Sequence, residues 1–444
     1  MSNIPAKQYV LIRSYTYSEV ILLHNPKPQV CFQPKSKMTK KFDPVEVSAP
    51  SKIILHGEHA VVYGKTAVAA SIGLRTRMIL RPVCGTPEIK LHFPDVNIEE
   101  SWTKEKVTDL LAKRPNRTAA VKRRRLSGDR TCDTDNDWWF PTDRIEADFL
   151  IEICQFLGVD KADLRFSSLT CFFYLYSMLR LEEDTFPPLD ISIQSDIPIG
   201  QGLGSSSALS VCLAAGLLAI RDQISTQKPL DDQRRNEICQ LSRVSEQILH
   251  GRCSGIDNAV STYGGLIRFA NFARVSWGGT GSNLVKSLGL RILLVGTKVP
   301  RNTKLLVDHV RKQTKEFPSI VQPVIDAIDS VSVECLATLD RMAASESDRA
   351  SCYRRLATLI DYNQRLLATL GVSHPSLDRV CAVAASNGLH GKLTGAGGGG
   401  YAYVLLPPDV KAEDLNRTVA ELKKENFDCW ETELGVDGVI VKLS

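Results

Sequence analysis

The stretch that decides the fold is Ser195-Asp196-Ile197-Pro198-Ile199-Gly200-Gln201-Gly202-Leu203-Gly204-Ser205-Ser206-Ser207-Ala208. Before it, apolar and polar residues alternate over 189–194, which predicts a strand with one buried face. After it, residues 208–220 are rich in alanine and leucine, which predicts a buried helix. The glycines let backbone N–H groups approach a bulky ligand, and the serines stand at the positive end of the helix. We interpret this strand, loop and helix as a phosphate cradle; the alternative is a tight turn with ordinary N-caps.

Length and composition indicate a globular protein of two domains. The chain has 444 residues, of which 43% are hydrophobic and 24% charged. A chain of this length is too long to fold around one compact core. The net charge of +5 does not by itself favour nucleic acid, and no uninterrupted apolar run approaches the ~18 residues of a membrane span. Twelve cysteines without a Cys-x-x-Cys pair favour reduced thiols over a disulfide framework or a zinc site. We therefore expect a cytoplasmic protein; residues 441–444 are not the peroxisomal Ser-Lys-Leu signal.

Composition divides the chain into an extension and two domains. Residues 1–44 are basic without a helical stripe, which predicts a disordered extension; a transit peptide and an over-called gene start are alternatives. Residues 45–284 form the predicted first domain, with a solvated insertion at 113–137 that is basic and then acidic. A Gly/Ser/Asn cluster at 276–283 marks the boundary, and residues 285–444 form the second domain.

The patterns in both halves predict a mixed α+β fold. Residues 46–55 indicate two short strands around a turn at Pro50, and residues 67–80 indicate a further strand. Helical spacing extends over 145–181, 234–250, 303–315, 319–344, 348–370 and 376–386. Further strands are predicted at 290–295 and 401–406.

A second glycine-rich run, Lys392-Leu393-Thr394-Gly395-Ala396-Gly397-Gly398-Gly399-Gly400, precedes the strand 401–406. Two such loops, one in each half, fit the phosphates of a nucleotide held between two domains. The run Gly64-Lys65-Thr66 is not a P-loop, because six residues separate Gly57 from Gly64 where a P-loop has four.

Phosphoryl transfer needs a divalent cation, oxygen ligands for it, a proton acceptor and positive charge. Ser206 at the predicted helix start and Glu246 on an amphipathic helix are candidate Mg²⁺ ligands; a solvated glutamate is the alternative for Glu246. Asp257 lies in a predicted loop of small residues and is a candidate proton acceptor or an N-cap. Lys52 stands in an apolar strand, where lysine is seldom buried unpaired. Beside Asp257 it would keep that carboxylate ionised and stabilise an incoming alkoxide.

Three signatures occur in the order that is typical of the GHMP kinase superfamily: Ser48-Ala49-Pro50-Ser51-Lys52, residues 200–207 and residues 392–400. Within it, residues 54–62, 254–262 and 297–303 closely resemble the animal mevalonate kinase family, and the resemblance covers roughly 46–440. It implies ATP- and Mg²⁺-dependent phosphorylation of the primary hydroxyl of mevalonate to 5-phosphomevalonate, for isoprenoid and sterol biosynthesis. It also implies a first domain like ribosomal protein S5 domain 2, a ferredoxin-like second domain, a homodimer, and feedback inhibition by prenyl diphosphates.

The resemblance also assigns roles to individual residues. The catalytic pair falls on Asp257 and Lys52, and the Mg²⁺ ligands fall on Ser206 and Glu246. The ATP-binding positions are Lys52, Ser195, Gly200, Gln201, Gly202, Leu203, Gly204, Ser205 and Ser206. The positions that line the mevalonate pocket are Glu58, His59 and Thr297. The chain departs from the family pattern at Ser51, Asp95, Ile199, Gln201, Ser207 and Arg252-Cys253; at Asp95 the family has a nucleotide-contacting asparagine.

Two other functions compete with this interpretation. One is phosphorylation of a different small molecule by another kinase of the superfamily, although residues 56–62 disfavour a galactokinase. The other is a ligand sensor on the same fold without catalytic activity. A sensor is disfavoured because Lys52 and Asp257 are both present.

Overall fold

The structure is a computed structural model. It describes residues 43–83, 87–114, 144–160, 162–179, 187–198, 202–222, 230–250, 254–271, 273–275 and 288–443. Several predictions therefore concern residues outside these ranges: the extension up to residue 42, the insertion from residue 115 onward, Ile199, Gly200, Gln201 and Arg252-Cys253.

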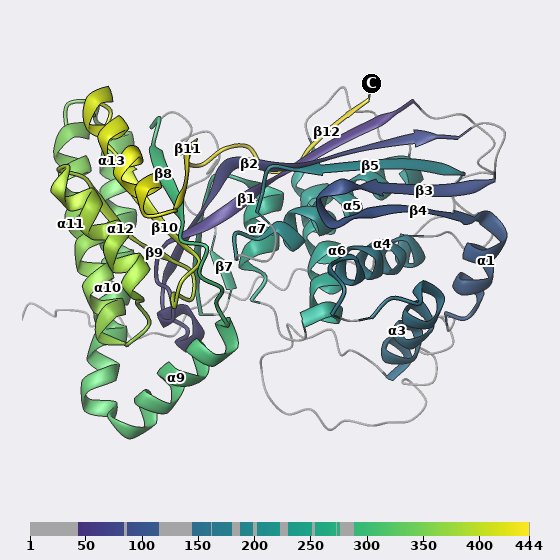
Figure 1. The fold of residues 1–444 in the computed structure, drawn as a ribbon, viewed down its shortest axis with the longest axis horizontal. Coiled ribbons are helices and arrows are strands. Elements are labelled where there is room, and N and C mark those ends of the chain that lie inside the picture. Colours follow the sequence, from purple (N-terminus) through teal and green to yellow (C-terminus); the bar gives the residue numbers. More distant parts are fainter. Residues whose placement is uncertain are drawn as a thin grey trace, which may run out of the picture. The chain divides into compact units, whose positions relative to one another are not determined.

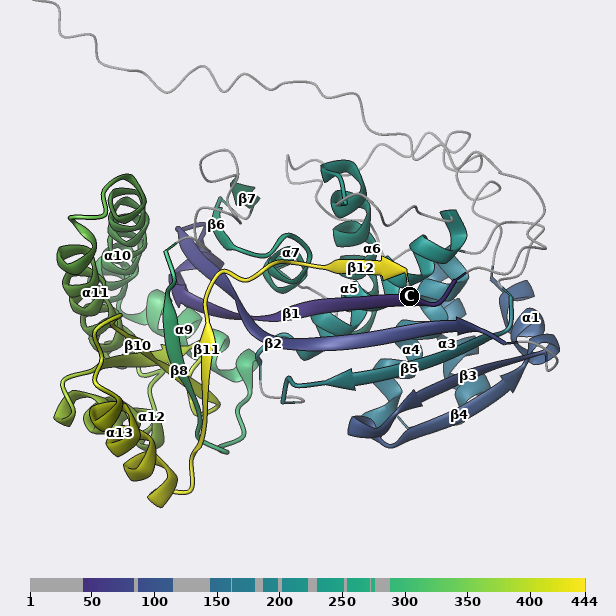
Figure 2. The same cartoon turned by 90° about the horizontal axis from the view of Figure 1, so that it is seen from above.

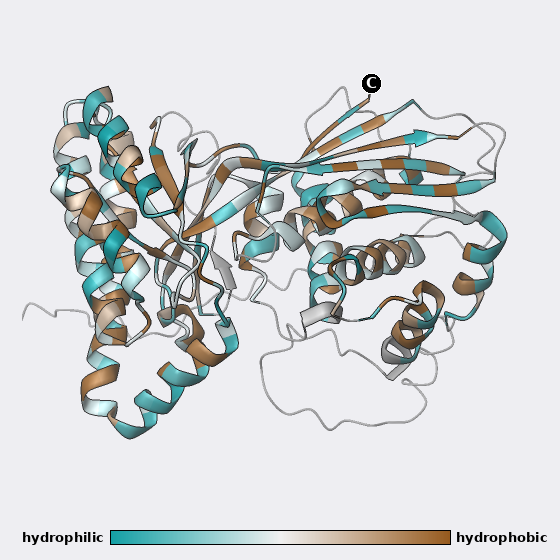
Figure 3. Ribbon diagram, viewed as in Figure 1, coloured by the Kyte–Doolittle hydropathy of each residue, from teal (hydrophilic) through white to brown (hydrophobic). Residues whose placement is uncertain are grey.

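A large sheet forms the scaffold of the first half (Figure 1). Within the described ranges it has eight strands in the order β12-β1-β2-β5-β3-β4, with β6 beside β2 and β7 beside β6. The pairs are antiparallel except β3 with β5. The strands are β1 Val45–His56, β2 Ala67–Pro82, β3 Glu88–Phe93, β4 Ile98–Thr103, β5 Leu189–Ser195, β6 Leu266–Ala270, β7 Ala273–Val275 and β12 Ile440–Leu443. Hydrophilic and hydrophobic bands alternate along these strands in Figure 3, as expected for a sheet with one buried face.

Helices cover one face of this sheet in Figure 1. They are α1 Lys104–Ala112, α3 Arg144–Leu157, α4 Leu164–Leu179, α5 Ser205–Asp222, α6 Asp232–His250 and α7 Ile256–Tyr263. Two short 3₁₀ turns, η1 Ala60–Tyr63 and η2 Pro94–Val96, follow β1 and β3. By length and composition α5 could cross a membrane, but 78% of that window is buried inside the protein, as expected for a core helix.

A second sheet organises the other half, with strand order β11-β8-β10-β9 and antiparallel pairs throughout. Its strands are β8 Arg291–Gly296, β9 His390–Thr394, β10 Tyr401–Leu406 and β11 Asp428–Glu433. The helices of this half are α9 Thr303–Glu316, α10 Pro318–Ala344, α11 Arg349–Thr369, α12 Pro375–Ser386 and α13 Ala412–Lys424. Figures 1 and 2 both place α11, α12 and α13 on the side of this sheet that faces away from the first sheet, whereas α10 packs against α11 and also contacts β1 and β2.

The structure confirms most of the predicted elements and corrects one of them. The strand predicted at 189–194 is β5, the buried helix is α5, and four predicted helices of the second half are α9 to α12. The two strands predicted around Pro50 are a single strand, β1. A register shift between Pro50 and Ser51 accommodates the proline, because a bulge tolerates a residue that has no N–H to donate.

The last strand of the chain crosses back to the first half. The predicted second domain included all residues from 285 onward, whereas β12 pairs with β1 in the first sheet. Arg75 holds the returning segment, since its Nη1 donates to Asp437 O at 2.7 Å and its Nη2 to Gly438 O at 2.7 Å. The second half of the chain therefore contributes one edge of the first sheet.

Candidate active site

The predicted catalytic pair forms in the structure. Lys52 Nζ lies 2.9 Å from Asp257 Oδ1, and the side chains are 7% and 35% exposed respectively. A lysine this deeply buried needs a partner, and the carboxylate provides one. The more exposed Asp257 leaves one face of the pair open to a substrate.

Asp257 lies on a helix and not in the loop that the sequence predicted. It is in the first turn of α7. Gly255 is the N-cap of this helix and has a left-handed φ of 74°. The small residues around it allow close packing: Ser261 Oγ of α7 donates to Pro50 O at 2.8 Å, beside the bulge of β1. Helix and strand are thus joined next to Lys52. The N-terminal end of α7 also favours a negative charge at Asp257.

The described part of the first glycine loop lies directly against this pair. The Leu203 carbonyl accepts hydrogen bonds from Lys52 N at 3.1 Å and from Ser51 Oγ at 2.7 Å. Ser51, a departure from the family pattern, therefore anchors the loop. Gly204 has a φ of 80°, and a Cβ there would lie 3.2 Å from Lys52 Cγ and 3.7 Å from Asp257 Oδ2. This left-handed φ and the close approach favour glycine, and the start of α5 lies beside the predicted catalytic pair.

Arg301 is a site residue that the sequence analysis did not identify. Its guanidinium occupies the space that the missing side chain of Gly202 leaves, 1.5 Å from where a Cβ would lie. It also lies beside Gly395 and Gly400 of the second glycine run, and its Nη1 donates to Thr394 O at 3.2 Å. Burial lowers the pKa of Arg301, and the charge of Asp257 partly opposes this. One cation therefore touches both glycine loops.

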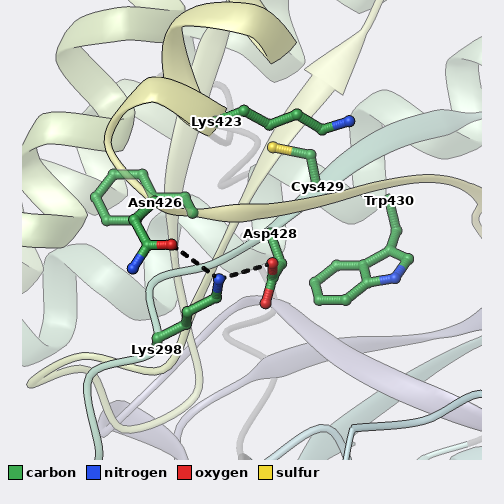
Figure 4. Close-up of a pocket in the computed structure, with 7 residues that line it drawn as sticks. Lys298, Lys423, Asn426, Asp428, Cys429 and Trp430 are labelled. Carbon is green, nitrogen blue, oxygen red and sulfur yellow. Dashed lines mark hydrogen bonds and ion pairs between the residues drawn. The ribbon is translucent and has the colours of Figure 1, made fainter.

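The loop that carries Arg301 is fixed at its other end by Thr297 and Lys298. Thr297, predicted to line the mevalonate pocket, donates from Oγ1 to Gly400 O at 2.9 Å and is buried. Lys298 has a left-handed φ of 60°, and Figure 4 shows its ammonium held by Asn426 and Asp428. The distances are 3.2 Å to Asn426 Oδ1 and 3.0 Å to Asp428 Oδ1, in a surface cavity of about 320 Å³. These contacts orient the loop toward the glycine run.

Glu58 and His59 lie at the same junction but are engaged with protein groups. Both Glu58 carboxylate oxygens have partners: Oε1 contacts Lys392 Nζ, and Oε2 accepts from Asn363 Nδ2 at 2.9 Å. Burial raises the pKa of Glu58, and the positive charge of Lys392 and its hydrogen bond partly offset this rise. His59 Nε2 lies 2.9 Å from Ala396 O, and burial lowers the pKa of this histidine. Each carboxylate oxygen of Glu58 thus has a protein partner, and its contact with mevalonate stays a prediction.

Ser195 and Asp95 meet at the end of β5. Ser195 N donates to Asp95 Oδ2 at 2.9 Å, and Ser195 Oγ lies 2.9 Å from Thr76 Oγ1. The carboxylate that replaces the family asparagine therefore binds the backbone of the serine that is predicted to contact the nucleotide. Asp95 is exposed, so its second oxygen is available to a donor group of a ligand.

The two predicted Mg²⁺ ligands lie on helices that pack together. Glu246 lies on α6 and is 6% exposed. Burial raises the pKa of Cys171 to about 12, and the nearby charge of Glu246 contributes to this rise. Cys171 Sγ lies 3.5 Å from Ser210 Oγ, one turn after Ser206 on the same face of α5. The described residues contain no group of three or more His, Cys, Asp or Glu side chains that could hold a metal. A hydroxyl and a carboxylate nevertheless fit Mg²⁺, which keeps several waters and binds substrate phosphates.

Comparisons with known proteins identify the family of this chain. Residues 173–265 match the GHMP kinases N terminal domain, and residues 343–424 match the GHMP kinases C terminal domain. The chain is 39% identical to the mevalonate kinase of Mus musculus over 402 residues, which cover 88% of this chain and 94% of that protein. The chain belongs to the mevalonate kinase family. It is therefore an enzyme, a kinase with the two-domain GHMP fold.

Other relatives agree with the assignment, and solved structures share the fold. The mevalonate kinase of Homo sapiens is 39% identical, covering 89% of this chain and 94% of that protein; that of Arabidopsis thaliana is 33% identical, covering 89% and 98%. A crystal structure of a mevalonate kinase matches with a TM-score of 0.61 at 24% identity, covering 88% of this chain and 98% of that one. The L. major enzyme in complex with R-mevalonate matches with a TM-score of 0.59 at 20% identity, covering 91% and 98%. Both structures share the fold of this chain.

Proposed function

We propose that the protein transfers the γ-phosphoryl group of ATP to the primary hydroxyl of mevalonate, giving 5-phosphomevalonate and ADP for isoprenoid and sterol biosynthesis. The observation that supports this most is the Lys52–Asp257 pair, 2.9 Å apart beside the first glycine loop of a chain from this family. An alcohol needs a proton acceptor when its oxygen attacks phosphorus, and Asp257 is a partly exposed carboxylate at that position.

In the proposed reaction the mevalonate oxygen forms a bond to the γ-phosphorus while the bond from that phosphorus to the bridging oxygen of ADP breaks. Asp257 accepts the hydroxyl proton and later releases it to solvent. Lys52 pairs with Asp257 and stabilises the alkoxide as it forms. Arg301, which touches both glycine loops, supplies positive charge to the transferring group.

Ser206 and Glu246 are the residues that would hold the magnesium ion. When bound, the ion neutralises charge on the β- and γ-phosphate oxygens. The hydroxyl of Ser206 lies at the positive end of α5, which itself favours phosphate. The proposal therefore assigns Ser206, Glu246 and the N-terminal end of α5 to the phosphates of ATP, and Asp257 to the hydroxyl of mevalonate.

The choice of acceptor tests the proposal. ADP release is measured with mevalonate, phosphomevalonate, homoserine and galactose at equal concentrations. Because residues 54–62 and 297–303 resemble the mevalonate kinase family, we expect mevalonate to be preferred by orders of magnitude in kcat/KM. Equal or faster turnover of homoserine or galactose would contradict the proposal.

Glu246→Gln tests the metal site. The substitution keeps size and hydrogen bonding but removes the charge that would hold the ion. We expect kcat to fall roughly 10²-fold, the scale for losing a positioned electrostatic stabiliser, and the Mg²⁺ concentration for half-maximal rate to rise. Nucleotide affinity in the absence of metal should be unchanged. Glu237→Gln on the same helix, where Glu237 pairs with Arg221 and Arg234, is the matched control. A parent-like Mg²⁺ dependence would make Glu246 a structural residue.

A further inference from the structure

Glu58 and Lys392 form a completely enclosed ion pair between the two halves of the chain. Both side chains are 0% exposed, and their positions in the sequence differ by 334. Lys392 Nζ also donates to Leu393 O at 2.6 Å and lies 5.3 Å from the ring centroid of Tyr403. Tyr403 in turn donates its hydroxyl to Leu55 O of β1 at 3.1 Å. The pair is thus the centre of a polar network that reaches β1.

Stability alone does not account for this pair. Removing two charges from water is costly, and replacing a buried ion pair with apolar residues of similar volume is often neutral or stabilising. Burial lowers the pKa of Lys392, which reflects this cost, and the charge of Glu58 opposes it. The pair is therefore better explained by the segments that it holds in place than by its contribution to stability.

Lys392 lies two residues before the point where the second glycine run is attached to β1. At that point Thr394 Oγ1 accepts from Ile54 N and donates to Ile54 O, both at 2.9 Å. Ile54 is two residues after Lys52 on the same strand. Thr394 O also accepts from Arg301 Nη1 at 3.2 Å. One residue of the run thus contacts both the strand of the catalytic lysine and the arginine that lies between the loops.

The other partner, Glu58, lies beside a second attachment of the same run. His59 follows it directly and contacts Ala396 O at 2.9 Å. The backbone of His59 has a φ of 59°, in the left-handed region that L side chains rarely adopt. Such a conformation persists where its surroundings hold it, and the pairing of Glu58 with Lys392 and Asn363 fixes the preceding residue.

We propose that Glu58 and Lys392 are positioning residues that fix the run 394–400 against β1, so that Arg301 and the bound phosphates meet Lys52 in one geometry. Neither residue touches a substrate in this account, which differs from the predicted pocket role of Glu58. The proposal rests on the proposed function only in that the glycine run is taken to bind the nucleotide.

The double variant Glu58→Gln/Lys392→Met removes both charges and keeps side-chain size. Each single variant leaves a buried group unpaired, so we expect a clearly lower unfolding temperature in each, largely recovered in the double variant. The double variant should nevertheless lose roughly tenfold or more in kcat and bind ADP several-fold more weakly, because small displacements of a positioned group are costly. Glu334→Gln/Arg355→Met, an exposed pair joining α10 and α11, is the control and should match the parent.

Thr394→Val tests the same connection without leaving a buried charge, and it decides the matter if the double variant does not fold. It should lower the unfolding temperature less than either single charge variant, because Ile54 loses two hydrogen bonds but no buried charge is left unpaired, and it should show the same losses in kcat and ADP affinity. Parent-like kcat and ADP affinity in a folded double variant, or in Thr394→Val, would overturn the proposal and leave the pair as a structural feature. ADP binding needs no acceptor, so a parent protein that binds ADP but does not phosphorylate mevalonate contradicts the proposed function alone.

Discussion

Asp257→Asn is expected to lower kcat by about 10²–10⁴-fold, the usual contribution of a general base, while the protein stays folded. Asparagine keeps the shape of the side chain and a hydrogen bond to Lys52, but it cannot accept the proton of the attacking hydroxyl. Because the proposed nucleotide contacts lie on the glycine loops, ADP affinity should change little. Steady-state kinetics and ADP titration of the same preparation measure both quantities.

The control for this substitution is Asp378→Asn, which also removes a carboxylate from the first turn of a helix, α12. It should leave kcat unchanged. Its change in unfolding temperature measures the stability that is lost with a carboxylate at a helix N-terminus, and this loss can be subtracted from that of Asp257→Asn. Lys52→Met should lower kcat as well, and the two losses should be clearly less than additive, because the residues act as one unit. Retention of more than about a tenth of the parent kcat in Asp257→Asn would contradict the base role.

Arg301→Met is expected to lower kcat by roughly 10²–10³-fold, the scale for losing one preorganised group that stabilises developing charge. Among the described residues, no carboxylate lies within ion-pair distance of this guanidinium, whose direct partner is Thr394 O. A cation held beside Gly202, Gly395 and Gly400, with no described carboxylate within ion-pair distance, is available to an anionic ligand. The phosphates of ATP are the anions that the proposed reaction brings there.

Arg301→Lys should recover part of the loss, because the charge is kept but the planar fork of donors is not. Arg291→Met on β8 is the matched control; Arg291 is an exposed arginine that pairs with Glu431. The measurements are kcat and the KM values for ATP and mevalonate. If Arg301→Met affected only the unfolding temperature and not kcat, Arg301 would be a structural link between the loops.

Residues close together in sequence explain what could be predicted. The helices of the second half have long apolar stripes with clear ends, and α9 to α12 lie within a few residues of their predicted positions. The strand before the glycine loop and the helix after it were predicted for the same reason. Lys52 in an apolar strand and Asp257 beside it were predicted through the family resemblance, and the structure joins them at 2.9 Å.

Features that depend on distant contacts could not be predicted from local patterns. Asp257 follows Gly255 and stands among small residues, which is typical of a loop, yet packing against β1 makes this segment helical. The strand β12 is only four residues long and gives no sign of its partner. Arg301 is a single arginine in a loop, and its role is visible only when Gly202 is found beside it.

The most direct test of the central claim is phosphorus-31 NMR of the products formed from ATP and mevalonate. The account predicts that the γ-phosphate signal of ATP is replaced by that of a phosphomonoester coupled to the two protons of the C5 methylene group. One ADP should form for each phosphorylated mevalonate, and the Asp257→Asn protein should form the product far more slowly. Formation of ADP with inorganic phosphate and no phosphorylated mevalonate would contradict the account.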